Sequence, residues 1–135
     1  MPVIVVTRLR LKDPAFFDEF FASAVAVMEQ AQNSAGNLGA DVLAEANNTY
    51  WTRTVWQVRD LMDAFVARDP HLHTMSRIDD WCDEATFVEW EQAGADLPDW
   101  QDSHERLVAS GQGPSLTQAT EAHHTRDFPA PVLSP

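Results

Sequence analysis

The sequence predicts an α+β protein with the ferredoxin-like order β-α-β-β-α-β, in which helices cover one face of a four-stranded antiparallel sheet. Three observations support this prediction. Alternating segments rich in β-branched and aromatic residues occur at 3–11 and 49–58. A long stretch between them repeats its apolar residues at helical spacing. Two Asp-Pro pairs, at 13–14 and 69–70, supply residues that begin helices.

The first half of the chain predicts a strand, a helix and a second strand. Residues 3–11 read VIVVTRLRL, so odd- and even-numbered side chains fall on opposite faces of a strand. Apolar residues then recur every three or four positions as far as Ala31, which predicts an amphipathic helix against the sheet. Residues 38–46 suit a strand, although their Ala and Glu also suit a helix. The pair beginning at Asn47 tolerates the positive φ angles of a hairpin turn and therefore favours the strand.

The second half continues the alternation. A short helix follows the strand at 49–58, the second Asp-Pro pair begins another helix, and residues 84–90 form a fourth strand. A last helix ends at Gly111. We therefore predict one domain over residues 1–111 and an extended, proline-rich tail at 112–135, either packed on the body or disordered.

Composition argues against several classes of function. The 135-residue chain has 9 Lys+Arg against 21 Asp+Glu, a formal net charge of −12, and no basic stripe of the kind that binds nucleic acid. No apolar run approaches the ~20 residues that a membrane helix needs. The first residues lack the pattern of a signal peptide, and Cys82 is the only cysteine. We expect a cytoplasmic protein without nucleic-acid or membrane partners.

A sheet with helices on one face leaves its other face bare. In this chain the bare face is expected to carry aromatic side chains, which would form an exposed apolar patch. Burying one large ring is worth roughly 2–3 kcal/mol. We therefore predict a homodimer whose two copies pack sheet to sheet, with the chain's own tail as the alternative cover.

Two segments carry a family resemblance. TYWTRTVWQVRDLMDAF spans residues 49–65, and HLHTMSRIDDWCDEATFVEW spans residues 71–90. With the order of elements, they make the chain similar to the dimeric α/β-barrel superfamily. It most resembles the antibiotic-biosynthesis-monooxygenase branch and the relatives that include spheroidene monooxygenase. This superfamily includes cofactor-independent oxygenases, haem enzymes and members without known activity. The resemblance therefore implies a fold and a possible monooxygenase activity, but no definite catalytic set.

His71 is the candidate catalytic residue, as a proton acceptor or a stabiliser of an oxyanion. Met75, four positions later, shares its helix face. A capping or surface histidine in the first helical turn is the simpler interpretation of His71. His73 lies about 200° around the helix from His71, so the two cannot face one site.

Aromatic residues supply most of the candidate substrate-binding side chains. We expect an apolar cavity for a small hydrophobic molecule, aromatic or polyketide-like, lined by Trp51, Trp56, Phe65, Met75 and Trp81. Packing in the core or at a dimer interface explains most of the tryptophans more simply. Trp51 and Trp56 lie on opposite faces of their strand, so at most one of them faces a given pocket.

No cofactor and no metal are expected. A helical His-x-His is a poor chelate, and Cys82 has no partner thiol for a zinc site. Haem bound through His71 stays an alternative, because members of the superfamily use it. The leading hypothesis is a monooxygenase-like oxidoreductase that acts on a small apolar or aromatic compound without flavin or metal. The alternatives are a haem-binding protein and a non-catalytic small-molecule-binding protein.

Overall fold

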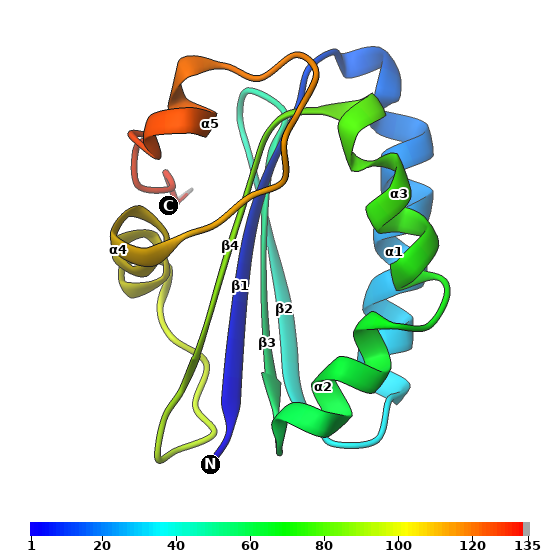
Figure 1. The fold of residues 1–135 in the computed structure, drawn as a ribbon, viewed down its shortest axis with the longest axis vertical. Coiled ribbons are helices and arrows are strands. Elements are labelled where there is room, and N and C mark those ends of the chain that lie inside the picture. Colours follow the sequence, from blue (N-terminus) through cyan, green and yellow to red (C-terminus); the bar gives the residue numbers. More distant parts are fainter. Residues whose placement is uncertain (134–135) are drawn as a thin grey trace.

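Four antiparallel strands form one sheet in the computed structural model, which describes residues 1–133 (Figure 1). The order across the sheet is β2-β3-β1-β4, and all three neighbouring pairs are antiparallel. The strands are β1 (Val3–Leu11), β2 (Asn37–Glu45), β3 (Thr49–Trp56) and β4 (Cys82–Glu91). This order confirms the predicted ferredoxin-like α+β fold.

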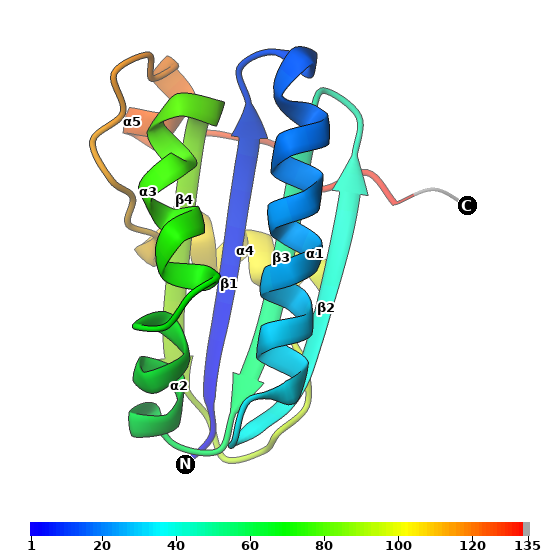
Figure 2. The same cartoon turned by 90° about the vertical axis from the view of Figure 1, so that its right-hand side faces the viewer.

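Three helices cover one face of this sheet, with α1 (Phe17–Asn33) beside α2 (Arg59–Val66) and α3 (His71–Trp81) (Figure 2). A 3-10 turn, Pro14–Phe16, leads into α1. The Asp13-Pro14 pair acts as predicted, with Asp13 as the N-cap and the proline at the first position of the 3-10 turn. At the second pair the prediction is wrong in detail, because Pro70 is itself the N-cap of α3 and Asp69 lies one residue before it. The Asp13 carboxylate accepts a hydrogen bond from the Ala15 backbone N (2.8 Å), and the Asp69 carboxylate accepts one from the His73 backbone N (3.1 Å).

The β2–β3 hairpin settles the ambiguous second segment as a strand. Asn47 and Asn48 both have positive φ angles, 63° and 58°, as predicted for a hairpin turn. The turn is one residue longer than the predicted two-residue link, because Glu45 pairs with Thr49 and residues 46–48 connect the strands. The period-two prediction for the following strand is also confirmed. Trp56 packs with Met62 and Phe65 under the helices, while Trp51 packs with Leu107 and Phe128 on the opposite side.

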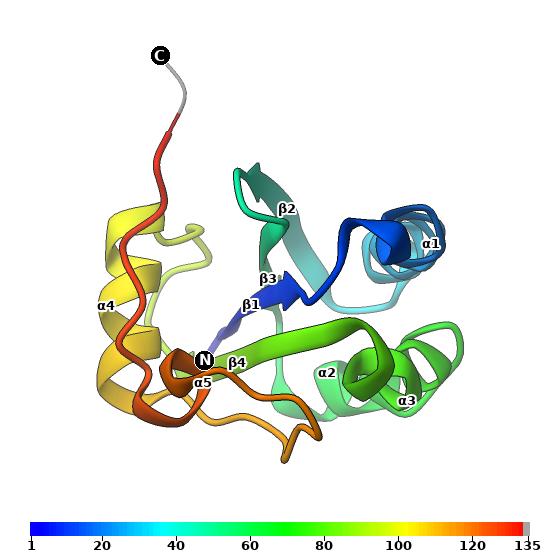
Figure 3. The ribbon, with the colours of Figure 1, turned by 90° about the horizontal axis from the view of Figure 1, so that it is seen from above.

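The opposite face of the sheet is covered by the C-terminal part of the chain. The helix α4 (Trp100–Ser110), the short helix α5 (Glu121–Thr125) and the segment after it lie against this face (Figures 1 and 3). Trp51 and Leu107 are fully buried there, and Phe128 is 4% exposed. The tail is therefore packed on the body, and it contains a helix that its lack of periodicity did not predict.

A buried ion pair also lies under this covering. Arg8 Nη1 donates to Glu84 Oε1 at 2.7 Å, and the Arg8 guanidinium lies 4.3 Å from the centre of the Phe128 ring. The carboxylate and the aromatic face together compensate a charge that the sheet would otherwise bury alone.

The C-terminal segments that cover this face of the sheet affect the prediction of a homodimer. The dimer was expected to bury a bare, tryptophan-bearing sheet face, but the chain's own α4 and Phe128 already occupy that face. Sheet-to-sheet packing through this face is therefore wrong, and the alternative cover, the tail, is the one observed. A homodimer through another surface stays a prediction. Within residues 1–133, no helix is long and apolar enough to cross a membrane.

Candidate functional site

A cavity of about 570 Å³ lies between the helix-covered face of the sheet and the helices α2 and α3. This volume is within the usual range for small-molecule sites. β1 and β4 form its floor, α2 and α3 form its roof, and residues 112–114 close one edge. Its apolar lining consists mainly of Val5, Leu9, Met62, Val66, Met75, Ile78, Ala85 and Phe87.

His71 lines this cavity at the start of α3. Its Nδ1 lies 3.1 Å from the backbone oxygen of Val66, the last residue of α2, and its ring packs 4.8 Å from that of Phe65. Because a carbonyl oxygen can only accept a hydrogen bond, Nδ1 carries the hydrogen in this arrangement. The neutral ring then keeps its lone pair on Nε2, which has no hydrogen-bond partner within residues 1–133.

The pKa of His71 is lowered from its ordinary value. Burial of the ring is the larger cause, and the bond to the Val66 carbonyl opposes it in part. Neutral imidazole is therefore the dominant form at neutral pH. An unprotonated Nε2 in an apolar cavity is the arrangement that a general base requires.

The charged groups at the cavity are acidic. Asp63 and Glu89 are lining residues, and none of the lining residues is Arg or Lys. Arg59 reaches Glu89 from α2, with 2.6 Å between Nη1 and Oε1, on the exposed surface. The cavity therefore favours an uncharged molecule over an anion, and any anion that forms inside it depends on protonated His71 for a counter-charge.

Residues 112–114 form one wall by pairing with the edge of β4. The backbones of Phe87 and Gln112 exchange two hydrogen bonds of 2.7 and 2.8 Å. His123 holds the same wall from outside. Its Nδ1 accepts from the Ala85 backbone N (3.2 Å), and its Nε2 lies 2.9 Å from the Pro114 oxygen, to which it donates. The tail therefore contributes to the site, a role that its extended sequence did not predict.

Gly113 permits this close approach, because a Cβ atom there would overlap the Ala85 carbonyl oxygen. We expect Gly113→Ala to destabilise the fold by about 1–3 kcal/mol, as overpacking does. It should also speed amide hydrogen exchange at Phe87 and Gln112. Gly94→Ala is the matched control, since a Cβ at Gly94 meets nothing within 4 Å. Equal exchange rates in both variants would contradict the assigned wall.

The structure brings His71 and Met75 together at the cavity, as their four-residue spacing suggested. Phe65 supports the His71 ring from the core side and also packs 4.8 Å from Trp56. Trp81 is 1% exposed and meets Phe20 edge to face in another part of the core. The three candidate residues Phe65, Trp56 and Trp81 are not among the lining residues.

Trp51 lies on the other side of the sheet from the cavity. Its ring packs with Phe128, and its Nε1 donates to Glu45 Oε1 at 2.6 Å. A molecule in the cavity cannot reach it, because the sheet intervenes. We therefore remove Trp51 from the candidate site and assign it to the packing of the tail.

Residues 1–133 show no group of three or more His, Cys, Asp or Glu side chains placed to hold a metal ion. Cys82 is fully buried, and burial, with a smaller effect of Asp83, raises the pKa of its thiol to about 12. A thiol of this kind is a poor nucleophile and a poor metal ligand.

Comparison with known proteins identifies the fold of this chain. No family model and no curated protein match the chain. A variant of SnoaB, a cofactor-independent oxygenase from Streptomyces nogalater, matches with a TM-score of 0.58 and 16% identity over 69% of this chain and 94% of that one. A structure described as antibiotic biosynthesis monooxygenase matches with a TM-score of 0.60 and 14% identity over 68% and 99%. The chain has the fold of the antibiotic biosynthesis monooxygenases.

Rv0793 from Mycobacterium tuberculosis also matches, with a TM-score of 0.63 and 14% identity over 70% of this chain and 97% of that one. The resemblance to the antibiotic-biosynthesis-monooxygenase branch is thus confirmed at the level of fold, and the spheroidene-monooxygenase-related subgroup stays a prediction. Each of these proteins is matched almost completely, whereas roughly three tenths of this chain lies outside the match. The chain is therefore longer than the fold that it shares with these structures.

Proposed function

We propose that this protein is a cofactor-independent, monooxygenase-like oxidoreductase that acts on a small, electron-rich aromatic compound. The observation that carries the proposal is a neutral His71, held by the Val66 carbonyl, at the wall of an apolar cavity. Likeness of fold to SnoaB, itself described as a cofactor-independent oxygenase, supports the same reading. His71 and Met75 are the proposed contacts, with Phe65 behind the histidine; Trp56 and Trp81 are proposed only as supporting core residues.

In the proposed reaction, His71 Nε2 removes a proton from a phenol or an enolisable ring, and the imidazolium formed balances the charge of the organic anion. The anion gives one electron to dioxygen, and the resulting radical and superoxide combine in a C–O bond. The peroxide takes the proton back from His71 and loses water. For a ring CH₂ group, one oxygen atom becomes the carbonyl oxygen, and the other leaves as water with the two hydrogens of the CH₂ group.

The lining explains why the substrate should enter uncharged. An anion would meet the Asp63 carboxylate, and no lining cation is there to bind it, because Arg59 lies outside the lining and is already paired with Glu89. A neutral aromatic compound meets mostly aliphatic and methionine side chains, which solvate it well. Deprotonation inside the cavity then creates the reactive anion beside His71.

Haem suits this cavity less well than a neutral substrate does. His71 Nε2 is a chemically reasonable axial ligand. Haem propionates, however, are anionic, and the lining residues include two carboxylates and no Arg or Lys. We therefore expect hemin to give no Soret band that depends on His71.

The proposal includes a cytoplasmic location, which the buried, unpaired Cys82 supports. It also includes a homodimer, but through a surface other than the covered sheet face. Sedimentation of the full chain tests the assembly directly. A single 15.1 kDa species would end the dimer proposal and leave the cavity chemistry intact.

Oxygen uptake with electron-rich anthrones and quinols tests the proposed activity. With isotopically labelled dioxygen, one labelled atom should appear in the product and one in water. Uptake should need no added flavin or metal and should survive chelators. If the compounds raise the melting temperature but are recovered unchanged, the protein is a non-catalytic small-molecule-binding protein and the oxygenase proposal is wrong.

The lowered pKa of His71 predicts the pH dependence of the reaction. Since the neutral ring is the base, kcat/KM should rise with pH and level off below about pH 6.5, the ordinary histidine pKa. The same shift should make the fold lose stability as the pH falls below about 6.5, because the unfolded chain then binds more protons. A pH–rate series and thermal melts measure both. A kcat/KM that decreases with pH across this window would contradict the assignment of His71 as a base.

A further inference from the structure

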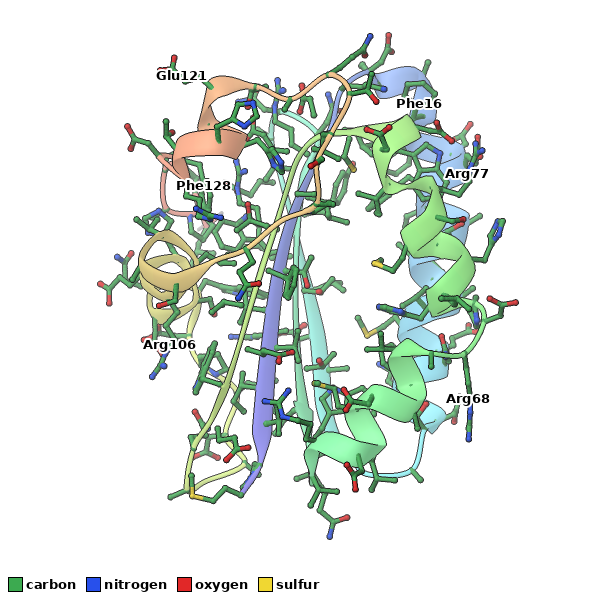
Figure 4. All side chains as sticks on the ribbon, in the orientation of Figure 1. Phe16, Arg68, Arg77, Arg106, Glu121 and Phe128 are labelled. Atoms are coloured by element: carbon green, nitrogen blue, oxygen red, sulfur yellow. The ribbon has the colours of Figure 1, made fainter. Side chains whose placement is uncertain are left out.

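One side chain of α1 makes three hydrogen bonds to the segment that joins α2 to α3. Gln30 Nε2 donates to the backbone oxygens of Phe65 (3.1 Å) and Arg68 (3.3 Å). Gln30 Oε1 accepts from the backbone N of His71 (2.9 Å). Arg68 directs its own side chain away from the sheet (Figure 4), so its contribution to this contact is its backbone carbonyl alone.

These bonds fix the two backbone segments that determine the orientation of the His71 ring, the end of α2 and the beginning of α3. The ring is oriented by the Val66 carbonyl, and Gln30 bonds the carbonyl of the residue immediately before Val66. Gln30 also bonds the backbone N of His71 itself. The end of α2 and the beginning of α3 are therefore tied to one amide group, which comes from a third helix.

The chemistry of this contact requires an amide. Two of the partners are acceptors and one is a donor, so the side chain must both donate and accept. A carboxylate of the same size can only accept, and an aliphatic side chain can do neither. Gln30 is only partly exposed, so water does not fully replace bonds that are lost.

We propose that Gln30 is a positioning residue for His71, which fixes the direction of the catalytic ring through the α2–α3 segment. This inference rests on the proposed function of His71. A general base must lie within hydrogen-bond reach of the proton it removes, and displacement by about 1 Å can cost on the order of a hundredfold in rate. Gln30 itself is not among the residues that line the cavity.

The test compares Gln30→Leu and Gln30→Glu with Gln32→Leu as the matched control on the exposed side of the same helix. NMR titration of the full chain reports the pKa and the tautomer of His71 without any substrate. We expect both Gln30 variants to lose the Nδ1–H tautomer of His71, because the ring no longer meets the Val66 carbonyl. Gln32→Leu should match the wild-type protein.

Turnover provides the second measurement. We expect kcat to fall roughly tenfold to a hundredfold in Gln30→Leu, with a smaller fall in Gln30→Glu, which keeps the bond from the His71 backbone N. If Gln30→Leu does not fold, the near-isosteric Gln30→Glu carries the test. Folded Gln30 variants in which His71 keeps the wild-type Nδ1–H tautomer would overturn the inference. A wild-type protein without turnover would instead overturn the proposed function, while the titration still decides the role of Gln30.

Discussion

Replacing His71 with alanine should lower oxygen uptake by about 10²- to 10⁴-fold, the usual contribution of a general base. The residue is the only histidine among those that line the cavity. Its removal deletes the lone pair proposed to take the substrate proton and the cation proposed to balance the resulting anion. Substrate affinity, measured by thermal shift, should change far less, because most of the lining is apolar and stays in place.

His73→Ala is the matched control for this experiment. His73 lies on the same helix but is exposed and is not among the residues that line the cavity. It should keep wild-type turnover. Equal losses in the two variants would show that damage to α3, rather than loss of a base, explains the His71 result. Full activity of folded His71→Ala would remove the proposed mechanism.

Replacing Trp51 with alanine should destabilise the fold by about 3–5 kcal/mol, the cost of deleting a large aromatic side chain from a packed core. Trp51 is fully buried and meets Trp100, His104 and Phe128. Its loss also leaves Glu45 Oε1 without the indole donor. Urea unfolding of the purified variant, followed by circular dichroism, measures the change.

The conservative variant Trp51→Phe separates stability from function. It keeps most of the packing, so the protein should fold and should retain wild-type KM for the substrate. This result is expected because the sheet stands between Trp51 and the cavity. A folded Trp51→Phe variant with strongly raised KM would place the substrate on the α4 side and refute the assigned site.

Local patterns in the sequence were sufficient to predict the strands and the hairpin at the core of the fold. Alternation of side chains predicted β1 and placed Trp51 and Trp56 on opposite faces, because successive side chains of a strand point in opposite directions. The Asn47–Asn48 pair predicted the hairpin, because its two residues accept positive φ angles. Each of these signals depends only on residues that are adjacent in the sequence, so one sequence is enough to detect it.

The cover of the second face and one wall of the site depend on contacts between distant residues. Phe128 reaches Trp51 and Arg8 across more than half of the chain, and no periodicity marks its segment. The wall at Gln112 is held by backbone hydrogen bonds to Phe87, which leave no side-chain pattern. The glycine at 113 was the one available signal, since close approach of two backbones excludes a Cβ.

The placement of the cavity wall at residues 112–114 has a consequence for how the protein matures. A ribosome delivers the chain from its N-terminus, so the strands and the first three helices emerge before this wall and before Phe128. Until those last residues arrive, the nascent chain has an unpaired β4 edge and an uncovered indole surface. Premature termination should therefore yield an aggregation-prone product rather than a smaller folded protein.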